Sequence, residues 1–505
     1  MTITSYGTGA YRAARPSEFV STRAKFDDLQ RQLDTGKKVT SYGDLGIERR
    51  TSLDLNAKKA SLDSWLSGIQ LADVNLKLST KAVEGFAKLT AETKNDARPG
   101  SYVESASGRS APQVLAEEKF KQALDLLNTN VGGRYLFSGR TSDTEPVVSY
   151  SLIMDGDGSG RAGLKQMIAE RKEADLGLTG LGRLTAGGAG TTATIAEEAG
   201  NPNYGFKLKS ATTTSAGLVP TYTAGPPADV SVNVAAQPQP GDTLRFKVDL
   251  PDGTQKEIVL TARAAGSNGS ATDTFEIGAD VNATAANLRA SVSAAFGKEA
   301  QTTLSASSAQ VAAKNFFDGS PSNPPVRVPG PPFATATAAP APGTAANTVI
   351  WYQGDDAPGS ARATSTVQVD QSETVAIGAR ANEEAFKVGL AQFAVFAAET
   401  FPAGDPNSKG RYEALAERVS NTIGYGTGVQ KPAEIIVELG TAQKAMASAK
   451  ERHTATQNYL TTTLAGVEEV TTEEVATQIL ALQTRLQASY QTTAILSKLT
   501  LTNYI

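Results

Sequence analysis

The sequence contains no cysteine, a single histidine, His453, and two tryptophans, Trp65 and Trp351. Without cysteine the chain can form neither disulfides nor thiolate metal sites, and it has no cysteine nucleophile. One imidazole cannot assemble the usual zinc ligand set, so we expect His453 to be a surface or core-edge residue of a helix. Motifs for a serine hydrolase, a phosphate-binding loop or a zinc protease are absent from the sequence. We therefore expect no catalytic residue, no metal and no cofactor, and a protein that is not an enzyme.

Long apolar runs and basic runs are missing as well. No segment has eighteen consecutive apolar residues, and the amino terminus, "MTITSYGTGAYRAARPSEF", lacks the apolar core of a secretory signal. The formal net charge is −4, and short basic pairs are interleaved with acidic residues, which argues against nucleic acid as a partner. We expect no membrane insertion and no cleaved signal peptide, while a specialised export route stays open.

What the sequence does contain falls into three zones of different composition. The 505 residues are enough for roughly two to four domains. We predict an N-terminal helical core at 1–146, a variable outer domain with hairpins and a Pro-rich connector at 147–370, and a C-terminal helical core at 371–505. The expected fold class is mainly α, with long terminal helices that form a coiled-coil core and a looped-out β-rich (α+β) outer domain.

Apolar residues in the first zone recur with helical spacing. Phe26, Leu29 and Leu33 predict a first helix, which "TGKK" at 35–38 should end because glycine and trailing lysines favour a helix carboxyl terminus. A strict seven-residue apolar repeat, typical of a coiled-coil seam, then comprises Leu62, Ile69, Leu76 and Val83. The spacing that predicts a third helix is that of Phe120, Leu124, Leu127 and Val131.

The middle zone is crowded with small residues and proline, and its strand signals are short. Alternating Leu244, Phe246 and Val248, followed by a Pro-Asp-Gly turn, predict a hairpin, and 283–296 is expected to be a short helix. The segment 319–343 is too rich in proline for a regular element and is expected to be an extended, exposed connector. Because this zone is looped out, we expect a deletion of residues 190–340 to be tolerated.

The third zone returns to helix. We predict helices at 383–400 and 412–422, and another that opens at Pro432 and runs to residue 464. A second heptad seam closes the chain and comprises Val475, Ile479, Leu482, Leu486, Ser489, Thr493, Leu496 and Thr500. We therefore expect the two ends of the chain to pair, and neighbouring subunits to complete the terminal seams.

One motif, "DGDGSGRAGLKQ", resembles known ligand-binding loops. Asp155, Asp157 and Ser159 fit the opening of a calcium loop, but Gln166 stands where that loop needs a bidentate glutamate. The glycines also spell G-x-G-x-x-G, although the acidic residue expected about twenty positions later is missing. A Gly/Asp turn accounts for the same residues with fewer assumptions, and this is the interpretation we favour.

Four stretches together resemble the bacterial flagellin family, and within it the hook–filament junction (hook-associated) proteins. They are "LQRQLDTGKKVTSYGDLG", "GGRYLFSGRTSDTEPV", "DGDGSGR" and "LQTRLQASYQTTAILSKLTLTNYI", in this order. The resemblance implies a structural subunit of the bacterial flagellum that polymerises through paired N- and C-terminal helices into the axial tube. It also implies an extracellular location, reached by export in unfolded form through the flagellar secretion apparatus. The implied partners are copies of itself, other flagellar axial proteins including flagellin, and an export chaperone.

The resemblance and the heptad pattern together name two sets of site residues. The assembly seam comprises Phe26, Leu29, Leu33, Leu62, Ile69, Leu76, Val83, Val475, Ile479, Leu482, Leu486, Leu496, Leu499, Leu501, Tyr504 and Ile505. An anchor between core and outer domain comprises Gly132, Gly133, Tyr135, Leu136, Phe137 and Gly139. In this anchor the two adjacent glycines should end the third helix, the apolar residues should form a plug or short strand, and Gly139 should turn the chain outward.

Other functions stay open at this point. The long looped-out middle would suit a major filament subunit (flagellin) for motility. A surface carbohydrate-binding or hydrolase module on a helical stalk would need a cleft lined by carboxylates or aromatics, and the middle zone offers few aromatics. Adhesion or immune recognition by the projecting domain could accompany the structural role, because a helical array makes weak contacts multivalent.

Overall fold

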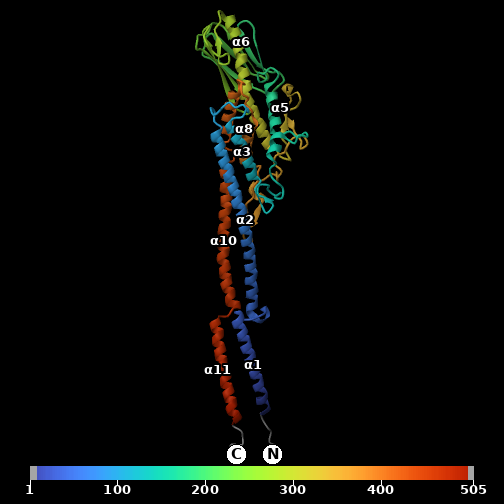
Figure 1. Ribbon diagram of the computed structural model, residues 1–505, viewed down its shortest axis with the longest axis vertical. Coiled ribbons are helices and arrows are strands. Elements are labelled where there is room, and N and C mark those ends of the chain that lie inside the picture. The colour runs from blue at the N-terminus through green and yellow to red at the C-terminus, as the bar shows by residue number, and fades with distance from the viewer. Residues whose placement is uncertain (1–7, 499–505) are drawn as a thin grey trace, which may run out of the picture. The chain divides into compact units, whose positions relative to one another are not determined.

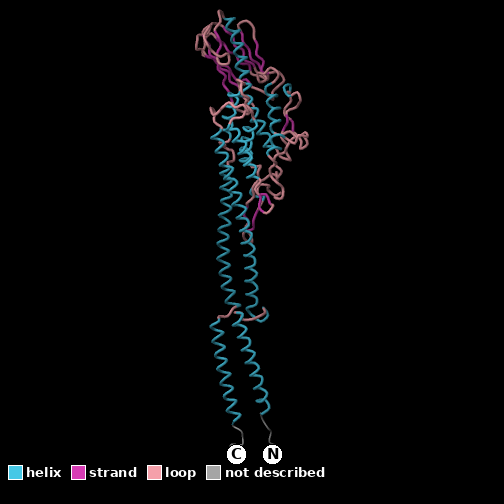
Figure 2. The backbone as a smooth tube through the Cα atoms, viewed as in Figure 1, coloured by secondary structure: helices cyan, strands magenta, loops and turns pink. Residues whose placement is uncertain are grey.

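The computed structural model describes the backbone of residues 8–498 and the side chains of residues 20–495. The fold is mixed α+β (Figures 1 and 2). Along the sequence, helices stand toward both ends of the chain, and the strands of two four-stranded sheets come between them. The first helices are α1 (Thr8–Thr35), the 3₁₀ helix η1 (Tyr42–Glu48), α2 (Arg49–Asp96) and α3 (Ala111–Leu127). The last helices are α8 (Glu384–Ala398), α9 (Ser408–Thr422), α10 (Pro432–Glu468) and α11 (Thr472–Lys498).

The described chain divides into two compact units. Unit 1 contains residues 8–71, 368–375 and 444–498, and unit 2 contains residues 72–367 and 376–443. Each unit is therefore assembled from segments that lie far apart in the sequence. The three-part division predicted from composition stays a prediction.

Unit 1 is built from paired terminal helices. Figure 1 shows α1 beside α11, and these two helices contact each other. The first part of α2 likewise meets the last part of α10, where the rings of Trp65 and His453 lie 5.4 Å apart. The short segment 368–375 forms a turn on the same unit, and its Val369 is fully buried.

The helix ends follow the local sequence signals. The predicted stop at "TGKK" is confirmed, because α1 ends at Thr35 and Gly36 has a φ of +69°. The third helix opens with a capping box in which Ser110 and Gln113 bond each other's backbone N–H groups. That helix stops at Leu127 rather than at Val131, which lies instead in a two-residue strand. The apolar spacing predicted a longer helix because Val131 is apolar whether it lies in a helix or in a strand.

Unit 2 carries the two sheets. One has the order β10-β9-β8-β5 and the other the order β3-β4-β7-β6. Their strands are β3 (Leu184–Gly187), β4 (Thr192–Glu197), β5 (Lys207–Thr213), β6 (Leu218–Thr223), β7 (Asp229–Val234), β8 (Thr243–Asp249), β9 (Gln255–Arg263) and β10 (Thr274–Glu276). Helix α6 (Val281–Glu299) contacts strands of both sheets, and the ring of its Phe296 meets Phe206 and Phe246 edge to face.

The predicted hairpin and the helix after it are both confirmed. Strands β8 and β9 pair antiparallel around the Pro-Asp-Gly turn, with Phe246 opposite Ile258. The predicted alternation of buried and more exposed side chains is confirmed, because Leu244, Phe246 and Val248 are all buried. The helix runs from Val281 to Glu299, and the Asp280 carboxylate accepts a hydrogen bond from the Ala283 N–H at its start.

The middle zone holds more helix than the sequence indicated. Its further helices are α4 (Tyr150–Asp155), α5 (Leu164–Leu176), the π-helical turn η2 (Ala300–Leu304), α7 (Ser305–Asp318) and the 3₁₀ turns η3 (Phe333–Thr335) and η4 (Ala361–Thr364). The remaining strands are β1 (Asn130–Val131), β2 (Arg134–Tyr135), β11 (Val326–Arg327), β12 (Ala341–Pro342), β13 (Thr366–Gln368) and β14 (Thr374–Ala376). Serine and alanine in "SASSAQVAAKNFFD" look like a loop, yet they let α7 pack closely on neighbouring helices.

The structure contradicts one expectation about this zone and argues against a second. The segment 319–343 is not wholly irregular, because β11 and β12 pair within it and Arg327 forms an ion pair with the buried Glu170. Deletion of residues 190–340 would also remove α7, which packs against α8. The ring of Phe317 on α7 meets both Phe120 and Trp351, outside the deleted range. We therefore expect that deletion to expose part of the core of unit 2.

Candidate functional site

In unit 1 the chain leaves the helical conformation at two places that lie next to each other. Between α1 and η1 the chain passes through Gly36 to Lys38, and between α10 and α11 it passes through residues 469–471. These two breaks bond to each other: the Lys38 N–H donates to the Glu468 carbonyl at 2.8 Å, and the Val470 N–H donates to the Gly36 carbonyl at 3.0 Å. A β-bridge between Lys37 and Glu469 completes this joint. Backbone groups that a helix end leaves unpaired are thus satisfied across the chain.

The predicted assembly seam divides by burial. Five of its residues are buried, namely Leu62, Ile69, Leu76, Val83 and Val475. Five more are half-buried, namely Phe26, Leu29, Ile479, Leu482 and Leu486. Leu33 is exposed. The side chain of Leu496 and the whole of Leu499, Leu501, Tyr504 and Ile505 lie outside the described residues.

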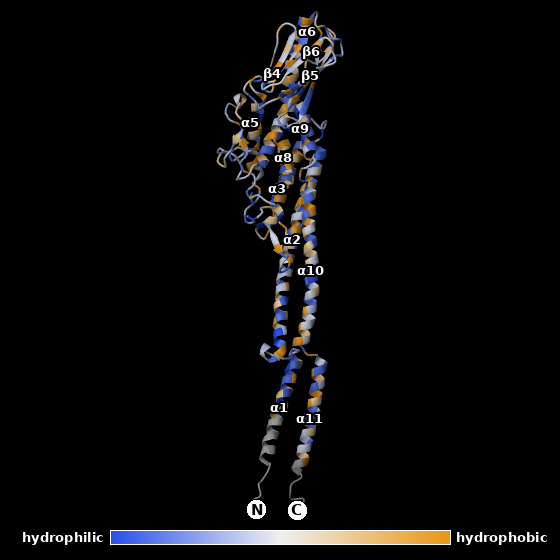
Figure 3. Cartoon of the chain, turned by 180° about the vertical axis from the view of Figure 1, so that it is seen from behind, coloured by the Kyte–Doolittle hydropathy of each residue, from blue (hydrophilic) through white to orange (hydrophobic). Residues whose placement is uncertain are grey.

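Large apolar side chains that the heptad pattern did not select are exposed on the outermost helices. Val20 on α1 is 67% exposed, and Leu480 and Ile495 on α11 are 64% and 59% exposed. Figure 3 shows hydrophobic positions interspersed with hydrophilic ones along α11. Side chains of this size normally gain free energy from burial, so these helices present apolar surface that the single chain leaves uncovered.

Polar contacts join α2 and α10 within unit 1. The Glu468 carboxylate accepts hydrogen bonds from Ser52 and, at 3.1 Å, from Asn56. Farther along, the Gln457 amide donates to the Asp63 carboxylate. Sequence reasoning missed these contacts because each residue alone looks like an ordinary solvated helix position.

The lone histidine is more buried than expected. His453 is 4% exposed, and its Nε2 lies 2.5 Å from the Val369 carbonyl oxygen. Because a carbonyl can only accept a hydrogen bond, Nε2 carries a proton and donates it. The expectation of a core-edge residue underestimated its burial, since neither Trp65 nor Val369 is near it in the sequence.

The anchor begins with a tight hairpin. Gly132 and Gly133 have φ angles of +58° and +82° and connect β1 to β2, in which Val131 pairs with Arg134. Two consecutive left-handed residues suit the twist of a two-residue hairpin turn, and glycine adopts them without a steric penalty. The expectation that these glycines end the third helix is therefore corrected, because they turn a hairpin that follows it.

The apolar part of the anchor reaches the core of unit 2. Phe137 is fully buried, whereas Tyr135 and Leu136 are half-buried. The Phe137 ring meets that of Phe386 on α8 edge to face at 5.7 Å. Its carbonyl accepts a hydrogen bond from the Ala381 N–H at 2.9 Å. The segment after β2 thus contributes one buried side chain and one backbone hydrogen bond to the part of the unit 2 core near the start of α8.

Gly139 lies where the chain turns away from this core. Its φ is +66°, and a Cβ built on it would lie 2.8 Å from the Cβ of Asp355. The Gly139 N–H donates to the Ala379 carbonyl at 3.3 Å, and the Asp355 N–H donates to the Ser138 carbonyl at 2.9 Å. Only glycine combines this backbone angle with so close an approach.

A second short pairing continues the anchor. Val147 bridges Tyr352, and both side chains are fully buried. The Val148 N–H donates to the Trp351 carbonyl at 3.1 Å. Burial raises the pKa of the Tyr352 phenol, whose hydroxyl donates to the Asp355 carbonyl at 3.2 Å. The segment that leads into the middle zone and the segment that leads out of it are therefore joined by backbone hydrogen bonds.

The DGDGSGR turn is held together by hydrogen bonds and an ion pair to one carboxylate, that of Asp157. Asp157 Oδ1 accepts hydrogen bonds from the Ser159 and Arg161 N–H groups, both at 2.9 Å, and its Oδ2 lies 2.7 Å from Arg161 Nε. The Arg161 guanidinium and the two N–H groups hold the pKa of the Asp157 carboxyl well below its usual range. Both carboxylate oxygens are thus used by the turn itself, as in an Asx turn.

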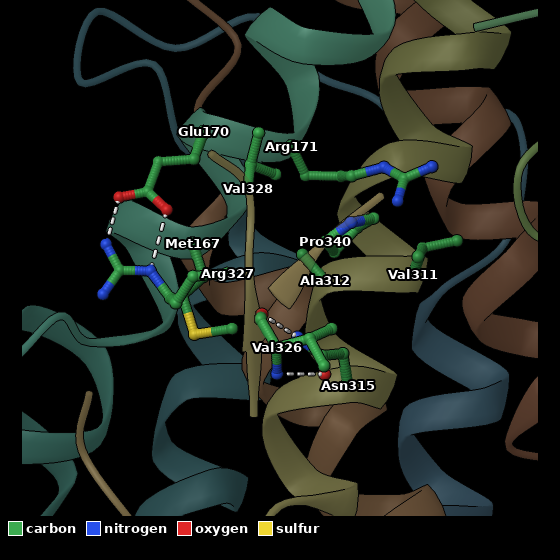
Figure 4. Close-up of a pocket in the computed structure, with 10 residues that line it drawn as sticks. All are labelled: Met167, Glu170, Arg171, Val311, Ala312, Asn315, Val326, Arg327, Val328 and Pro340. Atoms are coloured by element: carbon green, nitrogen blue, oxygen red, sulfur yellow. Dashed lines mark hydrogen bonds and ion pairs between the residues drawn. The ribbon is translucent and has the colours of Figure 1, made fainter. Parts of the chain in front are cut away.

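Among the described residues, unit 2 contains a small cavity and a larger polar cleft. The first, between α5 and α7, holds about 40 Å³ and is lined mainly by apolar groups, with Arg327 and Glu170 paired at its rim (Figure 4). That volume is enough for about one or two water molecules. The second is a polar cleft of about 530 Å³ beside α9. Its Arg418 pairs with Asp252 at 2.7 Å and its Lys256 with Glu299 at 3.7 Å.

Comparison with known proteins returns no match, either to a protein-family model or to a curated protein. Within residues 8–498, no helix is both long enough and apolar enough to cross a membrane. Among the side chains of residues 20–495, no cluster of three or more acidic or histidine groups is placed to bind a metal ion.

Proposed function

We propose that this chain is a structural subunit of the bacterial flagellum, located at the hook–filament junction. In this proposal the N- and C-terminal helices pair as a coiled coil and polymerise with those of neighbouring subunits into the axial tube. The observation that carries the proposal is the pairing of α1 with α11 while Val20, Leu480 and Ile495 stay exposed on them. Apolar side chains on a paired terminal helix are what a polymer interface would bury.

The partners follow from the same proposal. They are further copies of this chain, the other axial proteins on either side of it, and an export chaperone with the flagellar secretion apparatus. An extracellular location reached without a cleaved signal peptide fits a subunit that travels unfolded. The buried contacts of the anchor and of the joint form only after folding, so they are compatible with such a route.

A second candidate is the major filament subunit. It is favoured by the size of unit 2, whose two sheets and α6 form a separate hydrophobic core from Leu184 to Leu304. A large folded insertion suits the outer surface of a long filament. The flagellin-like stretches are shared by both candidates, so they do not separate them.

Copy number separates the two candidates. We would shear flagella from the organism that encodes this chain and measure the chain by quantitative mass spectrometry against the hook subunit. A small fixed number per flagellum is the expected result. Thousands of copies would support the filament subunit instead, and complete absence from flagella would contradict both.

A further inference from the structure

Helix α10 carries a seven-residue repeat with one polar member. Met446, His453 and Leu460 follow one another at steps of seven, and all three are buried in unit 1. The facing helix α2 contributes Leu62 and Ile69, again seven residues apart and buried. In paired helices, a single polar residue in an otherwise apolar seam fixes the register at some cost in stability. His453 occupies that position here.

The apolar residues alone do not determine how α2 and α10 align. If α10 moved by one heptad, Met446 or Leu460 would enter the place of His453, and His453 would take the place of the other. Such a shifted seam keeps much of its hydrophobic burial. The register therefore has to come from contacts that only one alignment satisfies.

His453 makes two contacts of this kind. Its ring lies against Trp65 on α2, with the centroids 5.4 Å apart, and its Nε2 donates to the carbonyl of Val369 in the turn at 368–375. That turn is closed by a hydrogen bond from the Val369 N–H to the Glu373 carbonyl, and Glu373 pairs with Arg452 at 3.0 Å. The histidine thus joins three separate segments of the chain.

The remaining polar pairs agree with the same alignment. As the residue number on α2 rises from Ser52 to Asp63, its partner on α10 falls from Glu468 to Gln457, as an antiparallel pair requires. A one-heptad shift would break both contacts and would leave the Val369 carbonyl without its donor. A buried carbonyl that loses its only donor costs more than the bond contributed.

We propose that His453 sets the antiparallel register of α2 against α10, and that the turn at 368–375 closes on the pair only in this register. The inference concerns pairing within one chain and goes beyond the proposed flagellar role. It would hold for any function that needs the terminal segments aligned.

Engineered cysteine pairs test the register directly, because the natural chain has no cysteine. Asp63→Cys with Gln457→Cys reports the alignment described above. Asp63→Cys with Lys450→Cys, and Asp63→Cys with Leu464→Cys, report shifts of one heptad in either direction. Each pair is made with His453 intact and with His453→Leu, and disulfide yield is read under mild oxidation.

With His453 intact, we expect disulfide formation only in the 63/457 pair. With His453→Leu, the yield of at least one shifted pair should rise by about tenfold, a change in population that corresponds to ~1.4 kcal/mol. Hydrogen exchange at 368–375 should become faster in the same variant. The control Arg452→Leu removes only the exposed ion pair and should leave all three yields unchanged.

If His453→Leu leaves the shifted pairs at their original yield, the proposal is wrong. If that variant does not fold, His453→Gln takes its place, since its amide can still donate to the Val369 carbonyl but cannot replace the ring against Trp65. A partial rise in the shifted pairs then supports the proposal, and yields identical to those with His453 contradict it.

Discussion

Phe137, in the segment after β2, and Phe386, on α8, meet edge to face with their ring centroids 5.7 Å apart. Phe386 in turn meets Phe86 of α2 at 5.0 Å, so the anchor is continuous with the helical core of unit 2. Removing this contact should therefore lower the free energy of unfolding of unit 2 by a measurable amount.

Replacing Leu136 and Phe137 with serine should destabilise unit 2. Truncating a buried phenylalanine typically costs about 3–5 kcal/mol, and the Phe137 side chain is fully buried. We expect a lower melting temperature and faster proteolysis within the middle zone, while α1 and α11 stay paired. Arg134→Ser, an exposed change on β2, is the matched control. Melting and proteolysis identical to those of the natural chain would show that the anchor does not stabilise unit 2.

Gly139→Ala tests the backbone of the same anchor. The φ of +66° alone should cost about 1–2 kcal/mol for a residue with a Cβ, and the approach of Asp355 should add to it. Gly426→Ala is the control, because Gly426 has no positive φ and nothing lies within 4 Å of a Cβ built there. Chemical unfolding of both variants gives the comparison, and equal stabilities would contradict the account of Gly139.

Acid should weaken unit 2 through two carboxylates that tie its parts together. Burial raises the pKa of Asp252, but hydrogen bonds from Thr254 and the charge of Arg418 on α9 outweigh it and hold that pKa below its ordinary value. Asp318 behaves in the same way, with Lys314 and Lys387 as its partners. Since both pKa values are lower in the folded chain, their stabilisation is complete above about pH 4 and is lost as the pH falls through the folded values.

The expected signature is a fall in the melting temperature of unit 2 below about pH 4. Asp318→Asn should lower stability at neutral pH and make the acid dependence shallower. Asp143→Asn, at an exposed site, serves as the control. An acid dependence unaltered by Asp318→Asn would show that this carboxylate does not contribute.

Truncation after Leu480 should separate folding from assembly. The shortened chain loses most of α11, including Leu482 and Leu486, which are half-buried in the single chain. We expect it to stay soluble, to keep the melting transition of unit 2, and to fail to polymerise in sedimentation and electron microscopy. A truncated chain that still forms filaments would argue strongly against assembly through the terminal helices.

Periodicity predicted the terminal helices well because each carries its own signal. Leu62, Ile69, Leu76 and Val83 are buried as their seven-residue spacing requires, and α10 begins at Pro432 as expected. In contrast, α7 was missed, since most of its buried residues are small alanines and serines, whose burial comes from packing against α8 and is not signalled by large apolar side chains. The partners of His453 could not be predicted either, because Trp65 and Val369 lie far from it in the sequence.

The most direct test of the proposed role is the position of the chain on an intact flagellum. We would raise antibodies against the sheets of unit 2, residues 184–276, and locate them by immunogold electron microscopy. The account predicts label confined to one band where the hook meets the filament. Label along the whole filament would make the chain the filament subunit, and flagella without any label would contradict a flagellar role.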